Sequence, residues 1–241
     1  MVTLPENKKR DISKPGKMKI WIYGAPMCGK TYLASQFPNP LILSTDGNIE
    51  FCDAPYMLIR DEMKKNGRIE KPTPAWQVFK ETIDELAKKD NTFETIVIDL
   101  VEDLYESCRL YKYAELGITH ESDDGFRAWD KVRTEFMSTM RRVSNLDYNI
   151  VWISHEDLTR DIVSANGKVT AIAPNIQPKI ANKLSGMMDL VVRCTYERGK
   201  REIHIKSDAI TFGGVRIPGK IPDVIPMEYS AIETLYTGKK E

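Results

Sequence analysis

Eight consecutive residues constrain the fold of this chain more than any other feature. They are Gly24-Ala25-Pro26-Met27-Cys28-Gly29-Lys30-Thr31, and they fit G-x-x-x-x-G-K-[ST] at every fixed position. The apolar residues 18–23 before them predict a strand, and residues 30–37 predict a helix that ends before Pro38. A glycine-rich turn between a strand and a helix directs backbone amides and the positive end of the helix dipole toward phosphate oxygens. The pattern therefore predicts a site for a nucleoside triphosphate, with ATP as the ligand.

The chemistry of each side chain predicts its role in this site. Lys30 would reach the β- and γ-phosphates, and the Thr31 hydroxyl would hold Mg²⁺. Tyr32, next on the same helix, joins residues 24–31 in the predicted nucleotide-binding set. A second metal ligand should be an acid at the end of another buried strand. Residues 95–98 lead directly into Asp99, which is predicted on Mg²⁺; the alternative is a helix N-cap.

Hydrolysis also needs an acid that activates water. Leu100, rather than a glutamate, follows Asp99, so this acid must come from elsewhere. Asp46, which follows a short apolar strand at residues 41–44, is favoured over Glu50. Three acids that follow Asp99 at helical spacing are interpreted as first-turn charges that complement the helix dipole: Glu102, Asp103 and Glu106.

Another apolar run ends in polar groups. Residues 149–153 predict a strand that continues into Ser154 and His155. If this strand lies between the phosphate-loop strand and the Asp99 strand, both side chains would face the γ-phosphate. A polar residue in that place can sense hydrolysis, so His155 is assigned to the catalytic site; the alternative is a surface histidine.

Strands and helices alternate along most of the chain. Besides the strands named above, residues 189–196 predict a fifth strand, and helices are predicted over residues 74–89, 100–116 and 126–145. This alternation is typical of an α/β fold with a mostly parallel sheet flanked by helices. The last sixty residues read instead as β-hairpins that extend one sheet edge, and residues 61–73 as a polar surface connection.

Composition sets the broad class of the chain. The 241 residues suit one large domain or two small ones, with 41% hydrophobic and 29% charged residues. We predict a basic flexible arm over residues 1–17 and one domain over residues 18–241. Lys plus Arg and Asp plus Glu both number 35, so nucleic-acid binding would have to depend on a local patch. The four cysteines form no CxxC pair, and no apolar run is long enough for a bilayer or a signal peptide. The sequence predicts a cytoplasmic protein without membrane association.

Four segments together resemble a known family. They are the phosphate loop, the Thr95-Ile96-Val97-Ile98-Asp99 strand, the Asn149-to-Glu156 strand and the stretch from Ala173 to Val192. The chain is similar, over about residues 18–210, to phage-encoded P-loop ATP-binding proteins of RecA-like fold, some of which act as single-strand-annealing recombinases. The resemblance implies a sheet order of 5-1-4-3-2 with the His155 strand in the middle. It also implies that Asp46 is the water-activating acid, at a position where RecA-like proteins more usually carry glutamate.

The resemblance further implies partners. Residues 158–178 would form the loop that contacts single-stranded DNA, with a hairpin turn at Asn166-Gly167 and positive charge from three residues: Arg160, Lys168 and Lys179. That loop carries no aromatic residue to stack on bases. ATP would lie between subunits of a homo-oligomer, and the neighbour would contribute Arg201 or Lys206. Ordinary cross-strand charges are the alternative for these two residues.

These features predict an ATPase that binds single-stranded DNA and assists phage recombination or replication in the host cytoplasm. Two alternatives remain open. A nucleotide-dependent binding module with negligible turnover would agree with the short Asp46 side chain and with Leu100. A small-molecule kinase would need an arginine-rich mobile lid, whereas the pair Arg141-Arg142 lies within a helical pattern.

Overall fold

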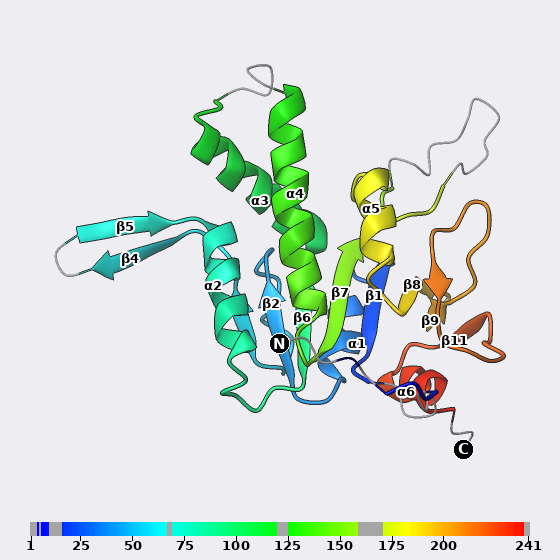
Figure 1. Cartoon of the computed structure of the whole chain (residues 1–241). Coiled ribbons are helices and arrows are strands. Elements are labelled where there is room, and N and C mark those ends of the chain that lie inside the picture. Colours follow the sequence, from blue (N-terminus) through cyan, green and yellow to red (C-terminus); the bar gives the residue numbers. More distant parts are fainter. Residues whose placement is uncertain are drawn as a thin grey trace, which may run out of the picture.

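The computed structural model describes residues 4, 6–9, 16–66, 69–119, 125–158 and 171–238. Nine strands form one sheet through the centre of this part of the chain (Figure 1). The strands are β1 (Lys19–Gly24), β2 (Pro40–Ser44), β3 (Tyr56–Leu58), β6 (Thr95–Asp99), β7 (Asn149–His155), β8 (Leu190–Glu197), β9 (Lys200–His204), β10 (Gly214–Val215) and β11 (Val224–Pro226). They lie in the order β11-β9-β8-β1-β7-β6-β2-β3, and β10 pairs with β8. The pairings from β8 to β3 are parallel, whereas β9, β10 and β11 pair in the antiparallel sense.

The complete strand order differs from the order expected from sequence, because β3 extends one end of the sheet and β9 and β11 extend the other. Within it, the five strands read from the sequence lie as β8-β1-β7-β6-β2, with β7 between β1 and β6. The hairpin extension at one edge is present as β8 and β9. Their connection has Arg198 and Gly199 at φ 49° and 79°, the left-handed pair that a two-residue hairpin turn requires.

Both faces of the sheet are buried. Alternate residues of a strand point to opposite faces, and on β1 the residues Trp21 and Tyr23 belong to one apolar cluster while Ile20 and Ile22 belong to the other. The first cluster includes residues of α2 (Ala75–Ala87), α3 (Val101–Leu116), α4 (Gly125–Ser144) and α5 (Pro178–Ser185). The second includes residues of α1 (Lys30–Ser35) and α6 (Tyr229–Thr237). Strands covered on both sides read as continuous apolar runs, which is why the sequence predicted them.

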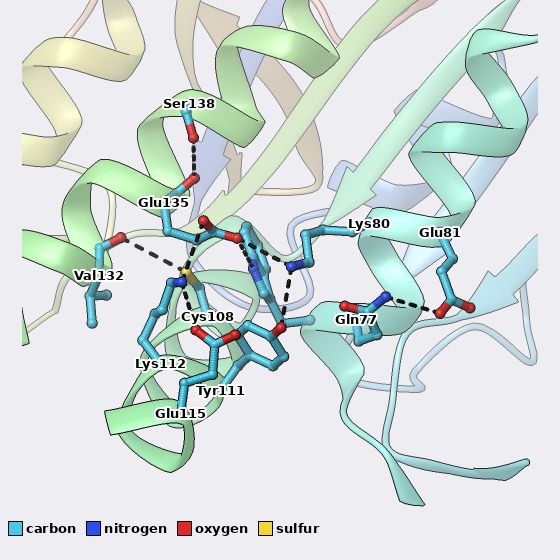
Figure 2. Close-up of polar contacts among 11 residues, drawn as sticks. Gln77, Lys80, Glu81, Cys108, Tyr111, Lys112, Glu115, Val132, Glu135 and Ser138 are labelled. Atoms are coloured by element: carbon cyan, nitrogen blue, oxygen red, sulfur yellow. Dashed lines mark hydrogen bonds and ion pairs between the residues drawn. The ribbon is translucent and has the colours of Figure 1, made fainter. Parts of the chain in front are cut away.

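A polar cluster connects three of these helices (Figure 2). The Glu135 carboxylate of α4 accepts hydrogen bonds from Trp76 Nε1 at 3.1 Å and Lys80 Nζ at 3.3 Å, both on α2. Lys112 Nζ of α3 lies 3.6 Å from the other oxygen. Burial raises the pKa of Glu135, but the hydrogen bond from Trp76 and the charges of Lys112 and Lys80 outweigh it and lower this pKa overall. The cluster is charge-compensated and stabilises the packing of α4 on α2 and α3.

Two segments differ from the sequence prediction. Where the sequence predicted a surface connection, β4 (Glu62–Asn66) and β5 (Ile69–Thr73) pair as a separate antiparallel ribbon, which projects from the sheet in Figure 1. The C-terminal region is not only β structure, because α6 buries Ile232 and Tyr236. Prolines at residues 218, 222 and 226 obscured the helical spacing of these apolar residues. The helix α5 was also not expected.

Most of the predicted basic arm, residues 1–17, lies outside the described residues, so that prediction stays untested. In the described ranges no helix combines the length and apolar character needed to cross a bilayer.

Candidate nucleotide-binding site

The carboxyl ends of five parallel strands meet at one edge of the sheet. The register places Gly24 of β1 opposite His155 of β7 and Cys194 of β8, and Ser44 of β2 opposite Asp99 of β6. Ligands of open α/β sheets bind beyond this edge. The phosphate loop and the polar residues that end the other strands are therefore brought together.

The glycines of the phosphate loop are required by its geometry. A Cβ on Gly24 would lie 2.2 Å from the backbone oxygen of Cys194, so only glycine fits where β1 passes β8. Gly29 adopts φ 104°, in the left-handed region, immediately before α1 begins at Lys30. The loop thus joins the end of β1 directly to the start of α1, which is the strand–loop–helix arrangement that the sequence pattern predicted.

Lys30 lies inside the loop. Its side chain is buried, with 5% of the residue exposed, and Nζ donates hydrogen bonds to the backbone oxygens of Gly24 at 3.0 Å and Ala25 at 2.9 Å. Among the described residues no carboxylate forms an ion pair with it. Its hydrogen-bond acceptors are uncharged, and the Asp99 carboxylate, whose pKa its charge acts to lower, forms no ion pair with it, so an anion in the loop would compensate the ammonium directly.

Thr31 and Asp99, the two predicted metal ligands, are in direct contact. Thr31 Oγ1 donates a hydrogen bond to Asp99 Oδ2 at 2.6 Å. The N-cap of α3 is Leu100, not Asp99, so the interpretation of Asp99 as a helix cap is wrong. A hydroxyl and a carboxylate are ligands that Mg²⁺ prefers when phosphate oxygens and water complete its shell. In the described ranges no group of three or more acidic, histidine or cysteine side chains could hold a metal ion.

The Asp99 carboxyl has an unusual proton affinity. Burial raises its pKa to about 6, helped by the carboxylates of Asp46 and Glu102 and opposed by Thr31 and Lys30. The folded protein therefore binds this proton more tightly than the unfolded chain does. The stability that results is complete at low pH and is lost as the pH rises from about 4 toward 6.

This pKa gives a first prediction. Asp99→Asn keeps the shape of the side chain but carries no charge, so it should stabilise the nucleotide-free protein at about pH 8 by up to about 3 kcal/mol and have little effect near about pH 3. Thermal unfolding of both proteins at the two pH values, without Mg²⁺ or nucleotide, measures the difference. A variant less stable than the wild type at the higher pH would contradict it.

Asp46 lies on the loop after β2. Its carboxylate accepts hydrogen bonds from Ser44 Oγ at 3.2 Å and from the backbone and side-chain nitrogens of Asn48 at 3.1 and 2.8 Å. Its charge contributes to the raised pKa of Asp99, so the two carboxylates are neighbours. Glu50, the less favoured acid, is exposed.

His155 has a partner that sequence reasoning missed. Its backbone N–H donates to Glu102 Oε1 at 2.6 Å, and Nδ1 lies 3.3 Å from the same oxygen. Glu102 Oε2 is buried and has no hydrogen-bond partner in the described part of the chain. The interpretation of Glu102 as a charge that complements the helix dipole therefore missed its contact with His155. The sequence did show that Glu102, on α3, follows Asp99, at the end of β6, by three residues. The expectation that Ser154 faces the γ-phosphate together with His155 was wrong. Ser154 points to the opposite face of the sheet from His155, and its Oγ accepts a hydrogen bond from Trp21 Nε1 at 3.0 Å.

The predicted basic residues lie in different places. Arg201 of β9 lies beside the phosphate loop of its own chain, because a Cβ on Gly29 would be 3.1 Å from its Nε. Lys206 forms an exposed ion pair with Asp223 at 3.2 Å. Lys179 is exposed in the first turn of α5. Arg160 and Lys168 lie outside the described residues.

The comparison with known families agrees with this geometry. No curated protein matches the chain. Residues 16–217 match the family model described as the AAA domain, a span that includes the phosphate loop, Asp99, His155 and Arg201. The match covers most of the sequence and indicates nucleotide binding and ATPase activity in general terms. The chain belongs to the AAA domain family.

Proposed function

We propose that this protein binds ATP with Mg²⁺ and hydrolyses it in a manner coupled to single-stranded DNA, in phage recombination or replication. The observation that carries the ATP part is the 2.6 Å contact between Thr31 and Asp99 next to the buried ammonium of Lys30. A cation, a hydroxyl and a carboxylate at the end of a phosphate loop are the groups that a magnesium–triphosphate complex needs.

Each residue has a distinct task in the proposed reaction. Mg²⁺, when bound, would neutralise charge on the phosphate oxygens, and Thr31 and Asp99 would hold it. Lys30 would leave the carbonyls of Gly24 and Ala25 and donate to the β- and γ-phosphates. Loop amides from residues 25–31 would donate to the remaining oxygens.

The water-activating acid is the second part of the proposal. Asp46 is assigned this role because it lies after β2 and is close enough to raise the pKa of Asp99. Glu102 would orient His155 through its Oε1, so that His155 reports on the γ-phosphate to the residues that follow β7. A nucleotide-dependent module with little turnover is the second candidate, since the Asp46 carboxylate already accepts three hydrogen bonds and Leu100 replaces an adjacent acid.

Product analysis tests these assignments. ATP is incubated with the protein and Mg²⁺, with and without single-stranded DNA, and the products are separated. We expect ADP and inorganic phosphate, formed faster with DNA. Unchanged ATP that is nonetheless bound would favour the binding module, and a phosphorylated small molecule would favour a kinase. We further propose a homo-oligomer with ATP close to the subunit interface, which light scattering with and without nucleotide tests.

The DNA part gives a separate prediction. Arg160 and Lys168 are proposed phosphate contacts, together with Lys179. The double variant Arg160→Ala/Lys168→Ala should bind single-stranded DNA more weakly and flatten the plot of log affinity against log salt by about 1.4, at about 0.7 per contact. ATP affinity should stay unchanged. Lys88→Ala, an exposed lysine on the C-cap of α2, is the matched control. Identical salt slopes for wild type and double variant would contradict the DNA assignment.

A further inference from the structure

An open cavity of about 580 Å³ adjoins the phosphate loop. One wall is α1 and its C-cap, with Tyr32 and Gln36. The other wall is β9, with Arg201, and the segment that leads into α6, with Met227 and the first α6 residue, Tyr229. Tyr32 is 65% exposed. The lining thus combines aromatic rings, hydrogen-bonding groups, one cation and one carboxylate, that of Glu228.

Arg201 connects this cavity to the phosphate loop. It lines the cavity, and its Nε and Cδ lie 3.1 and 3.3 Å from where a Cβ on Gly29 would be. Its guanidinium lies over the Tyr196 ring at 4.5 Å from the ring centre, which orients it. A ligand whose phosphates fill the loop therefore meets Arg201 at the mouth of the cavity.

The wall formed by residues 226–230 is fixed to the C-terminal end of α1 by direct contacts. The backbone N–H of Tyr229 donates to Gln36 Oε1 at 3.0 Å, and the rings of Tyr229 and Phe37 pack with centres 4.9 Å apart. The Met227 N–H donates to the Arg201 oxygen at 3.3 Å. These contacts place both walls before any ligand binds. Residues 226–230 of this wall lie beyond the family match, which ends at residue 217.

We propose that this cavity binds the nucleoside part of the nucleotide, and that Arg201 contacts the phosphates bound in the loop of its own chain. The proposal rests on the proposed function, because the phosphates must lie in the loop. The exposed Tyr32 ring offers a face on which a purine base stacks, and Gln36 and the polar groups of residues 228–230 face the base and ribose edges. Segment 226–230, which lies outside the matched AAA domain, thereby takes part in choosing the nucleotide.

Binding of two ligands separates the nucleoside from the phosphates. Affinities for ATP and for inorganic tripolyphosphate, both with Mg²⁺, are measured by calorimetry. Tyr32→Ala should weaken ATP binding about 10-fold and leave tripolyphosphate unchanged. Arg201→Ala should weaken both ligands. Tyr56→Ala, a half-exposed tyrosine on β3 at the far end of the sheet, should change neither.

The outcomes distinguish this proposal from the proposed function. Wild-type protein that binds neither ligand overturns the proposed function and the cavity assignment with it. Wild-type protein that binds both, with Tyr32→Ala leaving ATP affinity unchanged or weakening both ligands equally, overturns only the cavity assignment. Mixed Arg201→Ala and Lys30→Ala chains should not regain ATP binding; recovery would mean that Arg201 acts on a neighbouring subunit.

Discussion

Lys30→Met is expected to weaken Mg-ATP binding by at least about 100-fold, equivalent to about 2.8 kcal/mol. The ammonium is buried, and in the described part of the chain it donates hydrogen bonds to two loop carbonyls and, at 3.9 Å, to Cys28 Sγ, so its charge is available to phosphate oxygens. Methionine keeps most of the aliphatic stem that packs in the loop but has no charge and no N–H donor. Isothermal titration with ATP and Mg²⁺ measures the loss.

The control for this experiment is the exposed Lys88, whose replacement by methionine should leave ATP affinity unchanged. Thermal unfolding of the Lys30 variant should remain cooperative, because the aliphatic packing is retained. A folded Lys30→Met protein with wild-type affinity would remove the basis for the nucleotide site.

Asp99→Asn should lower Mg²⁺-dependent turnover by about 100-fold while metal-free nucleotide binding changes less than about 3-fold. The carboxylate, which contacts Thr31, is one of the two protein groups that we propose to hold the metal. The phosphate cradle itself consists of Lys30 and backbone amides, which the substitution leaves in place. Turnover with Mg²⁺ and nucleotide affinity in the presence of a chelator give the two values.

The pH–stability experiment serves as an internal check on this variant. Because the substitution removes a buried charge, the nucleotide-free variant should be folded and more stable near about pH 8, so lost activity cannot come from unfolding. Equal losses of affinity with and without metal would show that Asp99 maintains the loop rather than the metal.

Short stretches of sequence were sufficient to predict the phosphate loop and the strands around it. The loop needs glycine at Gly24 and Gly29 for steric and dihedral reasons, which are properties of neighbouring residues and so are visible in a short pattern. The five parallel strands are buried on both faces and therefore appear as apolar runs. Asp99 was predicted as a metal ligand because it directly follows such an apolar run.

Long-range contacts were not visible in this way. The pairing of Glu102 with His155 joins residues 53 positions apart, and the spacing of acids on α3 alone could not distinguish it from a helix-dipole effect. The helix α6 was hidden by the prolines before it, and the ribbon of β4 and β5 by its polar composition.

The sequence alone determined that this chain has the phosphate-loop pattern between a strand and a helix, and it predicted Asp99 as the acidic partner, because both are encoded within a few consecutive residues. Only the tertiary structure placed Arg201 beside Gly29 of the same chain and residues 226–230 against α1. Those placements depend on how β9 and β11 add to the edge of the sheet beyond β8. Strand pairing brings together residues about 170 to 200 positions apart, and no short pattern in the sequence encodes such a contact.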